Sequence, residues 1–144
     1  MDTGVTAELL YRFFCAFPGI SETVPLGFEA EAAGTAGGAF FAMEPARSDG
    51  RRYINGGGRS VGSCVISRRV PDADTVRRLE LAAWFSALET YVRVHGNLRE
   101  GDPASAQVLR VRPSSSAARL RMTRDGAVWE LRFSVEIYER MEDN

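Results

Sequence analysis

Few residues in this 144-residue chain could do chemistry. Three consecutive glycines, Gly56 to Gly58, suggest a phosphate-binding loop, but no Lys followed by Ser or Thr comes after them. The carboxylates of Asp72, Asp74 and Glu80 would suit a hard cation, yet a helix N-cap and a solvated helix face explain them as well. Neither pattern is complete, so the sequence predicts a protein that is not an enzyme and has no metal or cofactor.

His95 is the single histidine and the one candidate for acid–base catalysis. It lies at the end of the longest helical pattern, where a positive charge complements the last carbonyl groups. No Ser, Cys or carboxylate has a spacing that would make it a catalytic partner of His95. The sequence therefore predicts a capping and packing role for this residue.

A polar stretch from Arg51 to Arg59 joins two apolar segments of the chain. Its arginines, its tyrosine and its three glycines are too polar for a core and too mobile to hold a catalytic geometry. We interpret it as a surface loop that meets a partner. The predicted partner-interface residues are Arg51, Arg52, Tyr53, Asn55 and Arg59.

The elements around these residues follow from hydrophobic periodicity and turn residues. A helix is predicted over residues 6–16, and a long helix follows Asp72 or Asp74 and ends at Gly96, in the left-handed conformation. Strands are predicted over 26–30, 39–43, 60–70, 106–112, 117–123 and from about 127, with a hairpin turn at Asp125-Gly126 before the last. This order predicts a single domain, residues 1–144, of α+β class: a largely antiparallel sheet with both helices packed on one face.

The other face of the predicted sheet is charged. In the last strand, apolar residues from Trp129 to Ile137 alternate with polar ones, and the strand over 106–112 places Val108, Arg110 and Arg112 on one side. The charged face is either solvated, with cross-strand pairs worth about 0.2–1 kcal/mol each, or a subunit interface. The candidate subunit-interface residues are Arg119, Arg121, Glu130, Arg132 and Glu136.

The order and spacing of these features resemble the small minor capsid proteins, or tail terminators, of long-tailed bacteriophages and prophages. The matching features cover about residues 7–139. They are a first helix ending at Phe17-Pro18, the stretch from Arg51 to Gly56, Ser67-Arg68, Ala73-Asp74, Trp84-Phe85, Gly96-Asn97-Leu98 and Tyr138. The chain departs from the family in its run of three glycines and in the link from Pro113 to Ser116.

The resemblance implies a non-enzymatic structural protein of the virion. Such proteins form a homo-oligomeric ring, usually of six subunits, that completes the tail: it caps the tail tube and joins it to the head connector. The implied partners are other copies of the chain, the tail tube protein and the head connector protein. The implied location is the head–tail junction of the virion, after assembly in the host cytoplasm, and no apolar stretch is long enough to span a membrane.

Two other functions stay open at this point. One is a head–tail adaptor, which completes the head rather than the tail. The other is a nucleic-acid-binding module that uses the arginine pairs at 51/52, 68/69 and 77/78, with a non-specific contact to DNA in the tail lumen as its weaker form. A net charge of −1 argues against specific nucleic-acid binding.

Overall fold

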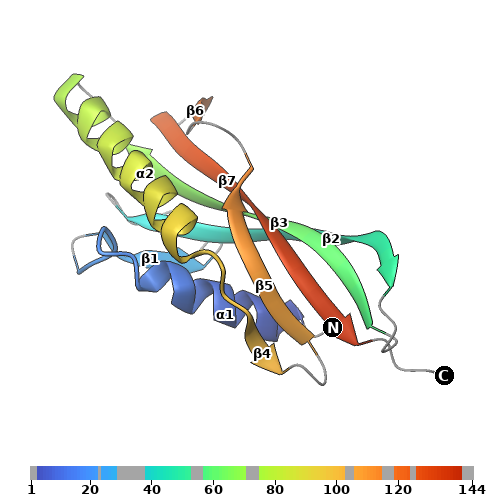
Figure 1. Cartoon of the computed structure of the whole chain (residues 1–144). Helices are drawn as coiled ribbons and strands as arrows, with labels where there is room; N and C mark the ends of the chain where they lie inside the picture. Colours follow the sequence, from blue (N-terminus) through green and yellow to red (C-terminus); the bar gives the residue numbers. More distant parts are fainter. Residues whose placement is uncertain are drawn as a thin grey trace.

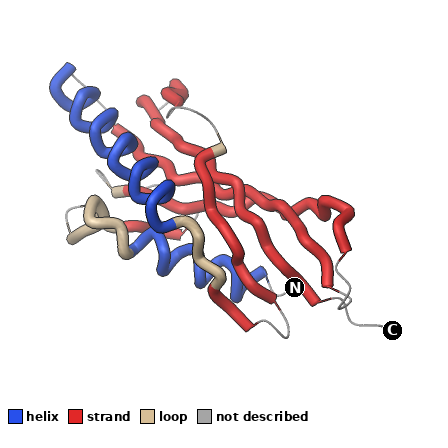
Figure 2. Tube along the Cα trace, viewed as in Figure 1, coloured by secondary structure: helices blue, strands red, loops and turns tan. Residues whose placement is uncertain are grey.

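The computed structural model describes residues 3–22, 24–28, 38–52, 57–70, 75–102, 106–114, 119–123 and 126–140. The elements in chain order are α1 (Thr3–Cys15), β1 (Leu26–Phe28), β2 (Ala39–Arg52), β3 (Gly57–Val70), α2 (Thr75–His95), β4 (Glu100–Asp102), β5 (Ala106–Pro113), β6 (Arg119–Thr123) and β7 (Gly126–Arg140) (Figure 1). Both helices lie on the same side of one sheet (Figure 2). The predicted α+β class, with helices on one face of a largely antiparallel sheet, is confirmed.

The strands are ordered β1-β2-β3-β7-β5-β4, and β6 also pairs with β7. All of these pairs are antiparallel except β1–β2, which is parallel. β7 runs along β3 over the full length of both strands, and its other edge is shared by β5 and β6. The last described strand therefore lies in the middle of the sheet.

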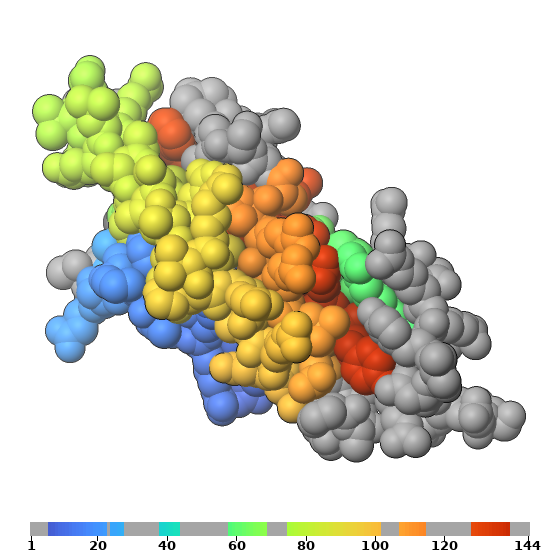
Figure 3. Space-filling model, in the orientation of Figure 1, coloured from blue at the N-terminus to red at the C-terminus, as the bar shows by residue number. Residues whose placement is uncertain are grey.

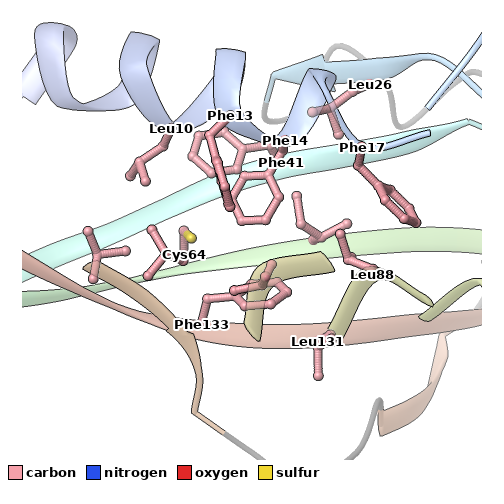
Figure 4. Packing of buried hydrophobic residues seen from close by; sticks show 14 of the residues in the cluster. Leu10, Phe13, Phe14, Phe17, Leu26, Phe41, Cys64, Leu88, Leu131 and Phe133 are labelled. Atoms are coloured by element: carbon pink, nitrogen blue, oxygen red, sulfur yellow. The ribbon is translucent and has the colours of Figure 1, made fainter. Parts of the chain in front are cut away.

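Helix α1 covers the sheet with aromatic side chains. Phe14 is 1% exposed, and its ring centroid lies 5.8 Å from that of Phe41 in β2 and 5.1 Å from that of Phe133 in β7. Figure 4 shows these rings between α1 and the strands, with Leu10 and Phe13 from the same helix beside them. The apolar side of α1, which repeats every 3.6 residues, thus packs on the apolar side of the strands, which repeats every two residues, and the two sides form one core.

Helix α2 lies beside α1 (Figure 3), and its predicted apolar face packs on the sheet, where the ring centroid of Phe85 lies 6.4 Å from that of Trp129 in β7. Leu81, Phe85, Leu88 and Val92 are buried, whereas His95, predicted on the same face, is exposed. Two side chains join α2 to the first segment of the chain. The indole Nε1 of Trp84 donates to Gly19 O at 2.9 Å, and the hydroxyl of Tyr91 donates to Phe13 O at 2.7 Å.

Gly96 ends α2, as predicted, but not through a left-handed backbone. Among the described residues a positive φ occurs at Arg99 (49°) and Gly101 (121°). A Cβ atom on Gly96 would lie 2.2 Å from Val111 O and 2.4 Å from Val92 O, so a side chain cannot be accommodated. The backbones are this close because Val111 N donates to Gly96 O at 2.8 Å, which joins the end of the helix to β5.

Two strand predictions need correction. β2 continues from the predicted Ala39–Met43 segment to Arg52, and β3 begins at Gly57 rather than at Ser60, whereas residues 29 and 30 of the first predicted strand lie outside the described residues. β2 tolerates Pro45 because its pairing with β3 shifts register between Glu44 and Arg47, and again before Arg52. At the predicted hairpin, Thr123 pairs with Gly126, while Arg124 and Asp125 lie outside the described residues, as do Asp72 and Asp74.

Candidate functional site

The face of the sheet away from the helices carries the charged residues. In β7, Leu131, Phe133, Val135 and Ile137 are buried toward the helices, and the residues between them face the other way, as predicted. We call this other side the open face, because neither described helix packs on it (Figure 1). Its described charged side chains are Arg59, Arg110, Arg112, Glu130, Arg132 and Glu136.

Glu136 is the centre of a charged cluster on the open face. Its Oε1 accepts a hydrogen bond from Arg59 Nη2 at 2.9 Å and lies 3.3 Å from Arg112 Nη2. Its Oε2 lies 3.9 Å from Arg110 Nε. The Glu136 side chain is 17% exposed, so this carboxylate is largely removed from solvent. We call these four residues the Glu136 cluster.

The sheet register explains why these residues meet. Glu136 pairs with Val61 in β3 on one side and with Arg110 in β5 on the other. Arg59 and Arg112 are each two residues from those partners on the same face, so both arginines reach the same carboxylate. Residues from three strands, distant in sequence, therefore form one ionic group.

A β-bulge places the two arginines of β5, and the sequence pattern missed it. The pairing of β5 with β7 shifts register between Val108 and Arg110. As a result Val108 and Val111 are both 1% exposed in the core, and Arg110 and Arg112 both reach Glu136. The prediction that Val108 shares a side with the arginines is therefore wrong. The feature of the sequence that placed Arg110 and Arg112 on the same face was their Arg-x-Arg spacing.

The Glu136 cluster has an excess of positive charge. Three guanidinium groups surround one carboxylate, and the side chains of Arg110 and Arg112 are 42% and 55% exposed. Arg59 is 23% exposed and makes the shortest contact with Glu136, so it is the principal partner of the carboxylate. Arg110 and Arg112 keep exposed donors that a planar carboxylate could accept in pairs.

The remaining predicted subunit-interface residues lie in β6 and further along β7. Glu130 pairs in register with Arg119 of β6, and Arg132 is exposed beside Val65. The side chains of Arg119 and Arg121 lie outside the described residues. Residue 130 is six residues from Glu136, about 20 Å along a strand. The predicted interface residues with described side chains, Glu130, Arg132 and Glu136, therefore share a face but lie in two places along it.

Two buried residues of β3 lie beside Glu130 and Arg132. Val65 and Ser67 of β3 are 8% and 5% exposed, and they pair in register with Arg132 and Glu130. Both side chains are already buried within the single chain, so they offer little surface to a partner.

The predicted partner loop is only partly a loop. Arg51 and Arg52 end β2, and Arg59 belongs to β3, so strand pairing extends into the predicted loop from both sides. Tyr53 and Asn55 lie outside the described residues, as do the side chains of Arg51 and Arg52. The structure assigns Arg59 to the Glu136 cluster instead. A strand forms here despite the glycine and arginine residues, because β7 supplies the hydrogen bonds that hold Gly57 to Arg59 in register.

Arg68 lies on the helix-covered face and serves the fold. Its guanidinium carbon is 4.9 Å from the centroid of the Trp84 ring, a cation–π contact between β3 and α2. Burial lowers the pKa of Arg68, and the negative charge of Glu80 partly offsets this effect. One arginine of the 68/69 pair is thus engaged inside the protein rather than presented to nucleic acid.

Of the residues considered for chemistry, Glu80 and His95 have described side chains, whereas Gly56, Asp72 and Asp74 lie outside the described residues. Over the part of the chain that the structure describes, no group of three or more His, Cys, Asp or Glu side chains could hold a metal ion. His95 packs on Tyr91, with ring centroids 5.0 Å apart, which agrees with the predicted packing role. Both residues line a groove of about 540 Å³ between the ends of α1 and α2, with Arg12, Phe13 and Glu100.

None of the described helices is long and apolar enough to cross a membrane. No known protein family matches the chain, and no curated protein is similar to it in sequence.

Proposed function

We propose that this chain is a non-enzymatic structural protein of a phage or prophage virion, which forms a ring that terminates the tail tube and joins it to the head connector. The order of motifs across residues 7–139 supports this proposal by resemblance. The observation that carries it is the open face of the sheet with its partly exposed Glu136 cluster. Such a face contributes little to the stability of a single subunit, and this supports a role in association.

The Glu136 cluster adds little to the stability of an isolated subunit. Partly exposed ion pairs contribute about 0–1 kcal/mol, and removing a carboxylate from water carries a cost that its partners only offset. Arginine, in contrast, is enriched in protein–protein interfaces. A partly desolvated arginine cluster on an uncovered sheet therefore suits a surface that a neighbouring subunit completes.

A closed ring requires each subunit to present contact surfaces to two neighbours. The long antiparallel pair of β2 and β3 provides a further contact surface. The tip of this pair lies at the opposite end of the sheet from the first residues of α2 (Figure 1). Arg51 and Arg52 end β2 at this tip, next to Tyr53 in sequence. We assign this tip to the contact with the tail tube or the connector.

The first test is the mass of the purified protein by light scattering, over a concentration series at low and high salt, with electron microscopy of the same samples. We expect a ring of about six subunits, either alone or after addition of isolated tail tubes. A stable dimer, or a monomer in every condition including with tubes, contradicts the proposal. Rings found on filled heads that lack tails, and absent from free tails, would instead favour the head–tail adaptor.

The second test replaces Arg51, Arg52 and Tyr53 together with alanine. We expect a folded ring-forming protein and about a tenfold loss of head–tail joining in a complementation assay, because a partly buried interface arginine or aromatic residue is worth 1 kcal/mol or more. The matched control is Arg78→Ala with Arg93→Ala on the exposed side of α2. Normal joining by the triple variant excludes a role for the β2–β3 tip.

A further inference from the structure

We infer that the ring contact is head-to-tail, with Arg110 and Arg112 of one subunit bound to Glu100 and Asp102 of the next copy of the chain. This inference rests on the proposed function and specifies one of its interfaces. It follows from the charges on two neighbouring strands at the edge of the sheet.

The basic side of the contact is the exposed part of the Glu136 cluster. Glu136 already binds Arg59 at 2.9 Å, while Arg112 and Arg110 approach the same carboxylate only to 3.3 and 3.9 Å. Within the Glu136 cluster one carboxylate is shared by three guanidinium groups, and the two outer arginines are about half exposed. Alternate residues of a strand are about 6.6–7 Å apart, so these two guanidinium groups suit two carboxylates at the same spacing.

The acidic side of the contact is β4, the short strand at the sheet edge beside β5 (Figure 1). Glu100 and Asp102 are alternate residues of β4, and they pair in register with Val108 and Ala106. Glu100 is exposed, and no ion pair joins it to another described residue. The backbone of β4 therefore places two acidic residues, at strand spacing, at an edge of the same molecule that carries two arginines at strand spacing, although the side chain of Asp102 lies outside the described residues.

The two charged surfaces lie on opposite sides of the sheet. Glu100 pairs with Val108, which is buried in the core, and it lines the groove beside Phe13 and Tyr91 on the helix-covered side. Arg110 and Arg112 lie on the open face with Glu136. One subunit cannot pair its own two surfaces through the sheet, and in the proposed ring each subunit meets two neighbours through two different surfaces. A head-to-tail contact pairs them, and this is the type of contact that closes into rings.

The charges favour a second copy of the chain over DNA as the occupant. The whole chain has a net charge of −1, and Glu130 and Glu136 interrupt the arginines of the open face. A polyanion gains little from such a surface, since DNA binding depends on neutralising many phosphates. A carboxylate pair on a neighbouring subunit needs only two guanidinium groups.

A charge-swap experiment tests this contact. One variant carries Arg110→Glu and Arg112→Glu, and the other carries Glu100→Arg and Asp102→Arg. Each variant alone should need at least about a tenfold higher concentration than the wild type to reach half assembly, because each contact then opposes like charges. An equimolar mixture should assemble within about twofold of the wild type, since every contact between the two variants pairs opposite charges. Assembly is measured by light scattering, with isolated tail tubes present if the wild type needs them.

Two further variants keep the result interpretable. Arg110→Gln with Arg112→Gln removes the charges without placing new carboxylates beside Glu136, and it should still raise the half-assembly concentration severalfold. Arg78→Glu with Arg93→Glu makes the same change of net charge on α2 and should leave assembly unchanged. Circular dichroism confirms that each variant is folded before its assembly is compared.

Each outcome has one meaning. Wild-type rings together with unimpaired rings of either reversed variant, or no recovery in the mixture of folded variants, overturn the inference but leave the proposed function standing. A wild-type protein that never assembles contradicts the proposed function itself. Salt-dependent DNA binding that the Arg110/Arg112 variant loses, with its assembly intact, would assign the arginines to nucleic acid and overturn the inference.

Discussion

The two faces of the sheet are made by the same strands but have opposite chemistry. In β7, Phe133 is fully buried against α1, whereas three residues later Glu136 is largely buried among arginines. The helix-covered face buries apolar area, which is worth about 25 cal/mol per Å². The open face buries charge, which stabilises a fold poorly. The helix-covered face thus stabilises the fold, and the charge on the open face is in keeping with the association that we propose for it.

The largest effect is expected on the helix-covered face. Phe14→Ala removes a ring that packs on Phe41 and Phe133 and should lower the free energy of unfolding by about 3–5 kcal/mol. Urea denaturation of the monomer measures it. Phe14→Leu is the matched control and should lose about 1–1.5 kcal/mol, because most of the volume is kept. A loss below 1 kcal/mol for Phe14→Ala would show that this face is not the principal core.

An intermediate effect is expected on the open face. Glu136→Gln leaves three guanidinium groups around a neutral amide and should lower the free energy of unfolding by about 1–3 kcal/mol. The paired change Arg59→Met with Glu136→Leu should cost less than the single change, since no buried charge is left without its partner. A loss for Glu136→Gln as large as that for Phe14→Ala would break the distinction between the two faces.

The smallest effect concerns the contact between α1 and α2. Tyr91→Phe removes the hydrogen bond to Phe13 O and should cost about 0.5–1.5 kcal/mol near neutral pH. Burial raises the pKa of Tyr91, so above pH 10 the unfolded chain loses this proton before the folded one does. The stabilisation that the Tyr91 hydroxyl contributes is fully present below pH 10 and decreases as the pH rises further.

Chemical denaturation at pH 8 and pH 11 measures this dependence. The wild type should lose more stability between these values than Tyr91→Phe does, because only the wild type has this hydroxyl to ionise. Equal losses would show that the Tyr91 hydroxyl is not shielded by the helix pair.

The sequence predicted the fold class and the helix-covered face well. Apolar periodicity is strong where one side of an element is buried, and Phe133, Leu88 and their neighbours lie where the pattern placed them. The extent of β2 was missed because Pro45 and Gly50 are typical of loops. Pairing with β3 determines how far β2 extends. Pairing between segments that are distant in the sequence leaves no pattern in the local sequence.

The candidate site was predicted only in part. Glu136 and Arg59 were both singled out, but for different interfaces, and their contact depends on the register of β3 against β7. Arg110 and Arg112 were placed on the wrong side relative to Val108, because a bulge shifts the alternation by one residue. A single-sequence pattern has no signal for a bulge.

The position of β7 also constrains how the protein is made. This strand completes the hydrogen bonding of β3, β5 and β6, yet it is the last of the described strands to leave the ribosome. Long-range pairing of this kind is slow to form, since loop closure precedes the contacts that reward it. A nascent chain that stops before residue 126 lacks the strand that carries Glu136, so prematurely released products hold neither a complete sheet nor the Glu136 cluster.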